Sequence, residues 1–517
     1  MKYDVIVVGA GAAGSILAAR LSEDPGRSVL LIEAGPDYPS LDSLPDKLKY
    51  GYTTAADITP SDHDWKFVGR ATAQAGPMLV PRGKVTGGSS AINGEIFLRG
   101  IPEDFEAWAS LGNTEWSFEN VLPFFCRLER DLDFQADFHG TQGPIPVRRF
   151  KRSEWLPPQV AFHDACRAAG FPDSPDHNDP NASGVGPIAL NNLDGVRWST
   201  NVGYLNPARR RPNLTLRPDC LVYRVLFEGQ RATGVLLQSA GETATVHGEE
   251  ILLCAGAIGS PHLLMLSGVG PADQLKSAGV PVKVELPGMG QNLRDHPHVY
   301  ASWCPRPGYL MDPELPRYQV ALRYTAPGSH LRNDMQILMV SFATGRVDRG
   351  GDGRTPVGIV MQPVLNLALG EGELRLQSSD PTIQPVLDYN FLTDPLDRSR
   401  LREALRLCLR LARHPAFDGI LGSRIAPTDE VMASDGALDE WMMREVSTTN
   451  HISGTCKMGP ASDPTTVVDQ YGKVRGLAGI RVADASIMPD CIRANTNATT
   501  MMIGERMADL IMRGERD

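Results

Sequence analysis

The stretch Asp4–Leu21, DVIVVGAGAAGSILAARL, decides the fold of this chain. It begins with a run of β-branched residues, passes through three glycines spaced as G-x-G-x-x-G, and continues into a segment whose small residues share one helical face. A second apolar run, SVLLIEAG, follows at Ser28–Gly35. Strand, glycine turn, helix and strand in this order predict a βαβ unit that holds a dinucleotide at its turn.

Each glycine of this turn has a predicted task. Gly9, Gly11 and Gly14 allow a tight turn, a close approach of the backbone to a pyrophosphate, and packing of helix against strand, while the helix N-terminus attracts negative charge. Glu33 lies 19 residues after Gly14, where a carboxylate can bind both hydroxyls of an adenosine ribose and would repel a 2′-phosphate. The pattern therefore disfavours NADP but does not by itself distinguish NAD from FAD.

Further along the chain, two more segments carry glycine turns. PRGKVTGGSSAIN, at Pro81–Asn93, is a second glycine-rich loop that can lie along a phosphate group or over a flavin ring. EEILLCAGAIGSPHLLMLSGVG, at Glu249–Gly270, is another strand–turn–helix pattern. There we expect Ser260 to cap a helix whose first residue is Pro261.

Composition limits the class of protein. The chain has 517 residues, enough for two or three domains, and a net charge of −10 that disfavours a nucleic-acid partner. Its apolar runs are too short for a membrane span, and its N-terminus lacks the pattern of a secretory signal. Eight scattered cysteines without a C-x-x-C pair indicate reduced thiols and no metal site. We therefore expect a cytoplasmic protein.

The pattern of elements predicts an α/β fold with two interleaved domains. Residues 1–150, 200–297 and 445–517 are expected to form a discontinuous, Rossmann-like dinucleotide-binding domain. Residues 151–199 and 298–444 are expected to form a substrate-binding domain of α+β type. Alternating strand patterns followed by a helical segment predict an antiparallel sheet with helices for this second domain.

Taken in order, these motifs resemble the glucose–methanol–choline (GMC) oxidoreductases, flavoproteins that oxidise alcohols, and the resemblance covers essentially the whole chain. GKVTGGSSAIN is similar to their first signature apart from Thr86, where they usually carry an aliphatic residue, and GAIGSPHLLMLSGVG fits their second. GMGQNLRDHP and GIRVADASIMP look like family segments near the flavin. The resemblance implies FAD as cofactor, with contacts from Gly9, Gly11, Ala12, Ala13, Gly14, Glu33, Ala34, Arg82, Gly87, Gly88, Ser89, Asn93, Gly94, Ala255, Gly256, Asp484, Ala485, Asn495 and Thr496.

The resemblance also implies the catalytic pair. His451, in TTNHISGTCKMG at Thr448–Gly459, corresponds to the active-site histidine, and Asn495, the first residue of NTNATT, corresponds to its partner. Hydride leaves a carbinol carbon for flavin N5 only as the hydroxyl proton is removed. A histidine, whose ordinary pKa is about 6.5, suits the removal of that proton. We therefore expect oxidation of a primary or secondary alcohol, with electrons passed to dioxygen or another acceptor.

Other expectations concern the flavin linkage and the substrate. Some relatives attach FAD covalently through a histidine at the position of Ile92, so the resemblance implies non-covalent FAD here. Glu95 and Asn450 are candidate substrate residues, and the alternative for Glu95 is an ion pair with a nearby arginine such as Arg99.

Several alternatives stay open at this point. A hydroxynitrile lyase of the same fold would use the histidine without net oxidation. An NAD-dependent dehydrogenase would explain the first glycine turn only. The class of alcohol, the choice between oxidase and dehydrogenase, and the oligomeric state are not indicated by the sequence.

Overall fold

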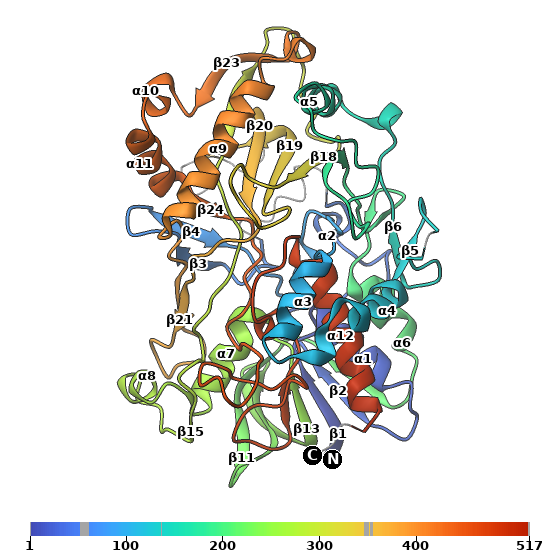
Figure 1. Ribbon diagram of the computed structural model, residues 1–517. Coiled ribbons are helices and arrows are strands. Elements are labelled where there is room, and N and C mark those ends of the chain that lie inside the picture. Colours follow the sequence, from blue (N-terminus) through green and yellow to red (C-terminus); the bar gives the residue numbers. More distant parts are fainter. Residues whose placement is uncertain (1, 52–60, 136, 346–350, 352–354, 515–517) are drawn as a thin grey trace.

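Two sheets at opposite ends of an elongated molecule form its frame (Figure 1). The computed structural model describes residues 2–51, 61–135, 137–345, 351 and 355–514. The architecture is α/β, as predicted, with one mixed and one antiparallel large sheet. The boundaries drawn between the two domains stay a prediction.

The first sheet is built around the predicted βαβ unit, which is confirmed. Strand β1 (Lys2–Val8) pairs in parallel with β2 (Val29–Ile32) on one side and with β13 (Glu242–Leu253) on the other. Both faces of β1 are covered near its carboxyl end, which explains the continuous apolar run there. The remaining strands are β10 (Leu214–Arg217), β11 (Cys220–Glu228), β12 (Arg231–Ser239) and β25 (Ile480–Val482).

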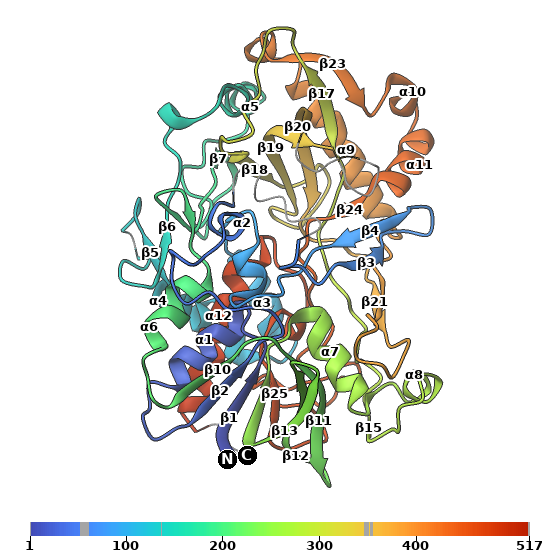
Figure 2. The same cartoon turned by 180° about the vertical axis from the view of Figure 1, so that it is seen from behind.

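Two helices from opposite ends of the sequence pack together beside this sheet (Figures 1 and 2). Helix α1 (Ala12–Leu21) contacts α12 (Thr496–Met512) so closely that a Cβ on Gly504 would lie 2.9 Å from the carbonyl oxygen of Ala13. The buried Glu505 of α12 accepts a hydrogen bond from Arg20 of α1 at 2.8 Å. This packing places the middle of α12, at Gly504, next to the residues that follow the glycine turn.

The second sheet is antiparallel. Its members are β7 (Gly184–Pro187), β16 (Pro297–His298), β17 (Ala301–Pro305), β18 (Tyr318–Tyr324), β19 (Met335–Thr344), β20 (Pro356–Leu365), β23 (Leu421–Ala426) and β24 (Ser447–Thr448). Helices α5 (Pro157–Ala168) and α9 (Pro395–Leu411) contact it. On α5, Gln159 donates to the hydroxyl of Ser341 at 2.8 Å, so the odd-numbered residues of β19 up to Ser341, where the strand register shifts, face this helix. Even-numbered residues face the other way.

Helix α7 (Gly256–Leu266) begins four residues earlier than Ser260, so the predicted start at Pro261 is wrong. A proline inside a helix leaves the carbonyl four residues before it without an intrahelical partner. Here that carbonyl belongs to Ala257, and the hydroxyl of Thr455 donates to it at 2.6 Å. A contact from a distant part of the chain thus lets the helix start at Gly256.

None of the helices within the described residues combines the length and the apolar character that crossing a bilayer requires.

Candidate functional site

A cavity of about 1000 Å³ lies between the two sheets and runs from the glycine turn after β1 to the inner face of β19 and β20. Three of the predicted site residues, Gly14, Gly87 and Glu95, do not line it. The others do: Gly9, Gly11, Ala12, Ala13, Glu33, Ala34, Arg82, Gly88, Ser89, Asn93, Gly94, Ala255, Gly256, Asn450, His451, Asp484, Ala485, Asn495 and Thr496.

The glycines form a cradle that a side chain would fill. A Cβ on Gly9 would lie 2.6 Å from the carbonyl oxygen of Cys254, and one on Gly14 would lie 2.0 Å from the carbonyl oxygen of Gly9. The second glycine loop touches the first, because a Cβ on Gly88 would lie 2.6 Å from the Cα of Gly11. Gly11 itself has nothing nearer than 3.9 Å to a Cβ, so its open side belongs to the cavity. Backbone alone therefore forms this wall.

Glu33 lies at the end of β2 and marks one end of the cavity. Its Oε2 accepts from the backbone N–H of Ala10 at 2.9 Å, and its Oε1 accepts from that of Gly35 at 3.0 Å. Burial raises the pKa of this carboxyl to about 7, although the backbone hydrogen bonds act in the opposite direction. A carboxylate held in this way has lone pairs left for hydroxyl donors in the cavity.

Asp484 connects the start of α7 to the C-terminal part of the chain. Its Oδ2 accepts from the backbone N–H of Gly256 at 2.8 Å and from the hydroxyl of Ser260 at 2.6 Å, while its Oδ1 accepts from the backbone N–H of Ser486. Burial raises the pKa of the carboxyl. Ser260, which the sequence predicts to cap α7, therefore donates its hydroxyl hydrogen to Asp484 instead.

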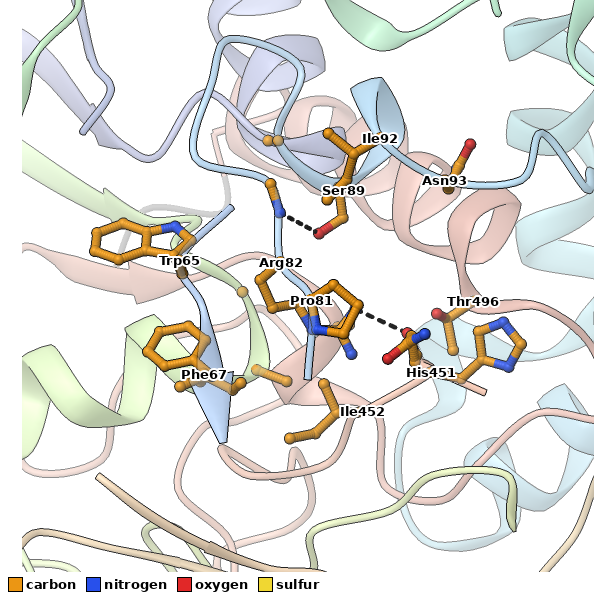
Figure 3. Close-up of a pocket in the computed structure, with 18 of the residues that line it drawn as sticks. Trp65, Phe67, Pro81, Arg82, Ser89, Ile92, Asn93, His451, Ile452 and Thr496 are labelled. Atoms are coloured by element: carbon orange, nitrogen blue, oxygen red, sulfur yellow. Dashed lines mark hydrogen bonds between the residues drawn. The ribbon is translucent and has the colours of Figure 1, made fainter. Parts of the chain in front are cut away.

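His451 and Asn495, 44 residues apart in sequence, come together at the cavity. The ring Nε2 of His451 lies 3.0 Å from the amide Nδ2 of Asn495. The backbone N–H of His451 donates to Asp295 Oδ1 at 3.0 Å, which fixes the loop. Figure 3 shows His451 and Thr496 on one side of the cavity, with Arg82 beside them. The structure thus brings together the imidazole and the carboxamide that the family resemblance pairs.

The neighbours of His451 determine which ring nitrogen carries its proton. His296 has its Nε2 2.7 Å from the carbonyl oxygen of Ile492, which can only accept, so that nitrogen bears the hydrogen. Burial lowers the pKa of His296 to about 4, so its ring is neutral and its Nδ1 is an acceptor. Nδ1 of His451 lies 2.8 Å away and must donate to it. The lone pair of His451 is therefore on Nε2, facing Asn495 and the cavity.

Thr449 independently requires the same tautomer. Its hydroxyl donates to the backbone oxygen of His296 at 2.9 Å, so only its lone pairs remain for Nδ1 of His451, 2.9 Å away. Burial is the largest cause that lowers the pKa of His451 well below its ordinary value, and electrostatic interactions with His296, Arg82 and His298 act in the same direction. An unprotonated Nε2 at neutral pH is what a general base requires.

Polar atoms without partners surround the middle of the cavity. Buried atoms that lack a hydrogen-bond partner within the described structure include, among the cavity residues, Nε and Nη2 of Arg82, Oδ1 of Asn450, Oδ1 of Asn495 and Nδ2 of Asn497. They offer both donors and acceptors, as the polar edge of an isoalloxazine ring requires. Together with the glycine cradle and Glu33, they make the cavity fit FAD.

Glu95 lies outside the cavity, and the arginine whose charge acts on it is Arg197 rather than Arg99. The chain takes a left-handed turn at Glu95, with a φ of 66°, and its carboxylate accepts from the backbone N–H of Gly51 at 2.8 Å and from Asn192 Nδ2 at 2.6 Å. Burial raises the pKa of Glu95 to about 7, opposed by the charge of Arg197. Arg99 pairs instead with a different carboxylate, that of Glu129.

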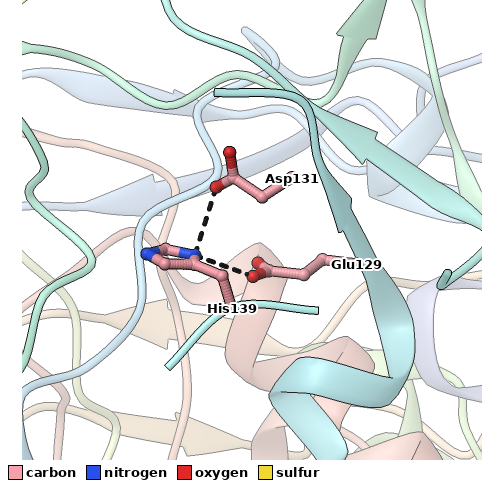
Figure 4. Close-up of side chains that lie close together, drawn as sticks. All are labelled: Glu129, Asp131 and His139. Carbon is pink, nitrogen blue, oxygen red and sulfur yellow. Dashed lines mark hydrogen bonds and ion pairs between the residues drawn. The ribbon is translucent and has the colours of Figure 1, made fainter. Parts of the chain in front are cut away.

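A second buried histidine lies among acidic groups, far along the chain from the cavity residues (Figure 4). His139 Nδ1 is 3.0 Å from Glu129 Oε1 and 3.2 Å from Asp131 Oδ2, and its Nε2 is 2.8 Å from Asp176 Oδ2. Burial acts to lower the pKa of His139, but hydrogen bonds to the three carboxylates outweigh it and raise that pKa to about 11.

Two arginines complete this acidic cluster. Arg149 pairs with Asp131 at 2.9 Å and with Asp176 at 2.6 Å, while Arg99 pairs with Glu129. Three cations therefore balance three carboxylates without a metal ion. We interpret the arrangement as a structural ion-pair network.

Sequence reasoning missed three residues of the cavity region. His296 lies within the segment GMGQNLRDHP, which was placed near the flavin without a role for its histidine. Gln336 and Gln362 lie on strands that are buried almost throughout, where apolar periodicity gives no signal for a polar position.

Comparison with known proteins gives consistent matches. A family model described as GMC oxidoreductase matches residues 3–298, and a second of the same description matches residues 368–504. An uncharacterised GMC-type oxidoreductase of Rhodococcus erythropolis is 36% identical over 99% of each chain. An oxygen-dependent choline dehydrogenase of Vibrio vulnificus is 35% identical over 99% of this chain and 94% of that protein. The crystal structure of pyridoxine 4-oxidase from Mesorbium loti superposes with a TM-score of 0.90 at 29% identity, covering 99% of both chains.

Proposed function

The chain belongs to the GMC oxidoreductase family, and on that premise we propose that it is an FAD-dependent enzyme that oxidises a primary or secondary alcohol to the carbonyl compound. The observation that carries the proposal is the 3.0 Å approach of His451 Nε2 to Asn495 Nδ2 at the cavity. The contact between Nδ1 of His451 and Nδ1 of His296 fixes the histidine tautomer. The similarity to a choline dehydrogenase and to pyridoxine 4-oxidase supports an alcohol as substrate.

The predicted cofactor contacts divide between the two ends of FAD. Glu33 would accept hydrogen bonds from the adenosine ribose, and the cradle of Gly9, Gly11 and Gly88 would lie along the pyrophosphate. Asp484 would contact the ribityl–pyrophosphate part. Ile92 lines the cavity where some relatives carry the linking histidine, which supports non-covalent binding. When bound, FAD supplies the two-electron acceptor for the hydride of the carbinol carbon.

His451 would act as the general base. An alcohol oxygen on the cavity side of His451 and Asn495 would give its proton to Nε2 and accept a hydrogen bond from the amide Nδ2. The Nδ1 hydrogen of His451 points at the His296 lone pair, so His296 would hold the base in the tautomer that leaves Nε2 without a proton. Asn495 thereby orients the oxygen, and His296 orients the base.

The proposal is tested by the spectrum of the purified protein and its response to alcohols. A flavoprotein gives an absorbance band at about 450 nm, and an oxidisable alcohol bleaches this band in the absence of air. A band that no alcohol bleaches would favour the lyase alternative, and a protein without the band would favour the NAD-dependent dehydrogenase. Reoxidation of the bleached protein by air then separates an oxidase from a dehydrogenase that needs another acceptor.

A further inference from the structure

The inner face of the second sheet forms one wall of the cavity. The side chains that β19 and β20 contribute to it are Gln336, Leu338, Val340, Ala343, Thr344, Val360, Gln362 and Val364. Five of these eight side chains are aliphatic, and the two glutamines lie among them. A polar side chain in an apolar wall needs a hydrogen-bond partner, so each glutamine calls for an explanation.

Both glutamines have an unused polar atom. Gln336 is 3% exposed, and its Nε2 has no hydrogen-bond partner within the described structure. Gln362 is 5% exposed, and its Oε1 likewise has no partner there. One donor and one acceptor are thus left over on a single face of the sheet. Native proteins seldom bury such atoms unless a ligand or water completes them.

Strand register places Gln336 at the His451 end of the cavity. Gln336 pairs with Val364, Val364 is the partner of His298, and His298 pairs with Ser447. These four residues form a row across β19, β20, β16 and β24. His451 follows only four residues after Ser447, and it lines the same cavity.

Gln362 lies beside this row. It precedes Val364 by two residues on β20, so the two side chains point to the same face of the sheet. Its cross-strand partner is Leu338, which precedes the cavity-lining Val340 in the same way on β19. Gln336 and Gln362 are therefore diagonal neighbours that can contact one ligand group together.

The charges of the cavity differ between its ends. Among the described residues that line it, the carboxylates are Glu33 and Asp484. Both accept hydrogen bonds from backbone N–H groups, and both are predicted FAD contacts. The sheet wall next to the two glutamines carries no acidic side chain among its described residues. A substrate bearing a quaternary ammonium would find no counter-ion among the described residues of that wall.

We propose that Gln336 and Gln362 form a specificity subsite for an alcohol that carries a second, uncharged group on an apolar body. That group both accepts and donates a hydrogen bond, as a hydroxyl or a carboxamide does: it accepts from Gln336 Nε2 and donates to Gln362 Oε1. The aliphatic side chains contact the body of the substrate. The inference rests on the proposed alcohol oxidation and names the class of alcohol.

A series of benzyl alcohols that differ at one position tests the subsite. The ligands are 4-(hydroxymethyl)benzamide, 4-methylbenzyl alcohol, 4-(hydroxymethyl)benzoate and choline, and anaerobic flavin bleaching gives Kd and the limiting rate for each. We expect Kd for the carboxamide to be at least about 10-fold lower than for the methyl compound, because the methyl compound leaves both glutamine atoms unpaired. Equal affinities, or tighter binding of the benzoate or choline, would overturn the proposal.

Two variants test whether the glutamine amides cause the preference for the carboxamide. Gln336→Met and Gln362→Met keep the length of the side chain and remove its amide. Each should weaken binding of the carboxamide about 10-fold and leave the methyl compound within about twofold. Gln142→Met, at an exposed position outside the cavity, is the control. A uniform loss for all ligands would mean a structural role and would contradict the subsite.

Binding of compounds that cannot be oxidised separates this inference from the proposed function. 4-Methylbenzamide has no carbinol, and its binding can be followed by the thermal shift of the intact protein, with 1,4-dimethylbenzene as the apolar match. Selective stabilisation by the amide, lost in both glutamine variants, supports the subsite even if no alcohol bleaches the flavin. Bleaching by alcohols without amide selectivity would leave the function standing and reject the subsite.

Discussion

Two buried histidines in this molecule have opposite acid–base behaviour. His451 faces other histidines and an arginine, and its pKa is lowered well below the ordinary value. His139 lies between three carboxylates, and its pKa is raised to about 11. Burial acts to lower the pKa of both, so the neighbouring charges decide the outcome. The first histidine is a neutral base whose lone pair faces Asn495 and the cavity, and the second is a lasting cation that holds acidic groups together.

The comparison predicts opposite effects of pH on stability. His139 is raised in the folded protein, so its stabilising contribution is complete below about pH 6.5 and is lost as the pH rises towards about 11. His451 is lowered, so the folded protein loses stability as the pH falls below about 6.5, where the unfolded chain binds a proton and the folded one does not. A falling pH therefore increases the stabilising contribution of His139 and decreases the stability that His451 allows.

The largest expected effect is on catalysis. His451→Ala should lower the limiting rate of flavin reduction by at least about a hundredfold, because the hydroxyl proton loses its acceptor. Flavin content should stay unchanged. His330→Ala, at an exposed position, is the control. A variant that keeps near-normal turnover would remove His451 from the role of base.

The next effect is on stability. His139→Leu leaves three buried carboxylates with two arginines, and we expect a loss of about 3–5 kcal/mol in the free energy of unfolding, measured by denaturant titration. His247→Leu, on the exposed side of β13, should change it by less than about 0.5 kcal/mol. A His139 variant as stable as this control would show that the cluster is not a stabilising network.

A smaller effect is expected for His296, which accepts a hydrogen bond from His451. His296→Leu removes the acceptor for the Nδ1 hydrogen of His451, and we expect the limiting reduction rate to fall about tenfold. The acidic limb of the pH–rate profile should also move to higher pH, because a group that lowers the pKa of His451 is lost. His296→Gln keeps an acceptor and should recover part of the rate. A fall in rate with an unmoved profile would indicate a purely structural role.

The smallest effect concerns the other end of the cavity. Glu33→Gln removes one acceptor oxygen from the predicted ribose contact, and the Kd for FAD, measured by fluorescence on reconstitution, should rise about 5- to 10-fold. Glu23→Gln, on the exposed surface next to α1, is the matched control. Equal FAD affinity in the two variants would argue against a ribose contact at Glu33.

What the sequence could predict follows from how each feature is encoded. The βαβ unit depends on local periodicity and on glycines that the backbone itself requires, so Asp4–Leu21 was enough to place it. The approach of His451 to Asn495 came from matched motifs rather than from spacing. The start of α7 was missed because Thr455, 198 residues away from Ala257, satisfies a carbonyl that Pro261 leaves free.

Other features depend on contacts that local patterns do not contain. Glu95 was placed in the pocket because it follows the flavin loop, but a single left-handed φ turns it toward Asn192. The tautomer of His451 follows from His296, 155 residues earlier. Gln336 and Gln362 become neighbours only when β19 and β20 pair. Each is a matter of tertiary geometry.

The pH dependence of kcat/KM for an oxidisable alcohol tests most directly whether His451 is an unprotonated base. This parameter reports ionisations of the free enzyme. The lowered pKa predicts a rate that is level from about pH 6.5 upward and falls only in more acidic solution. A rate that instead rises with pH through about 7 to 8 would mean that His451 is protonated at neutral pH, and would contradict the account.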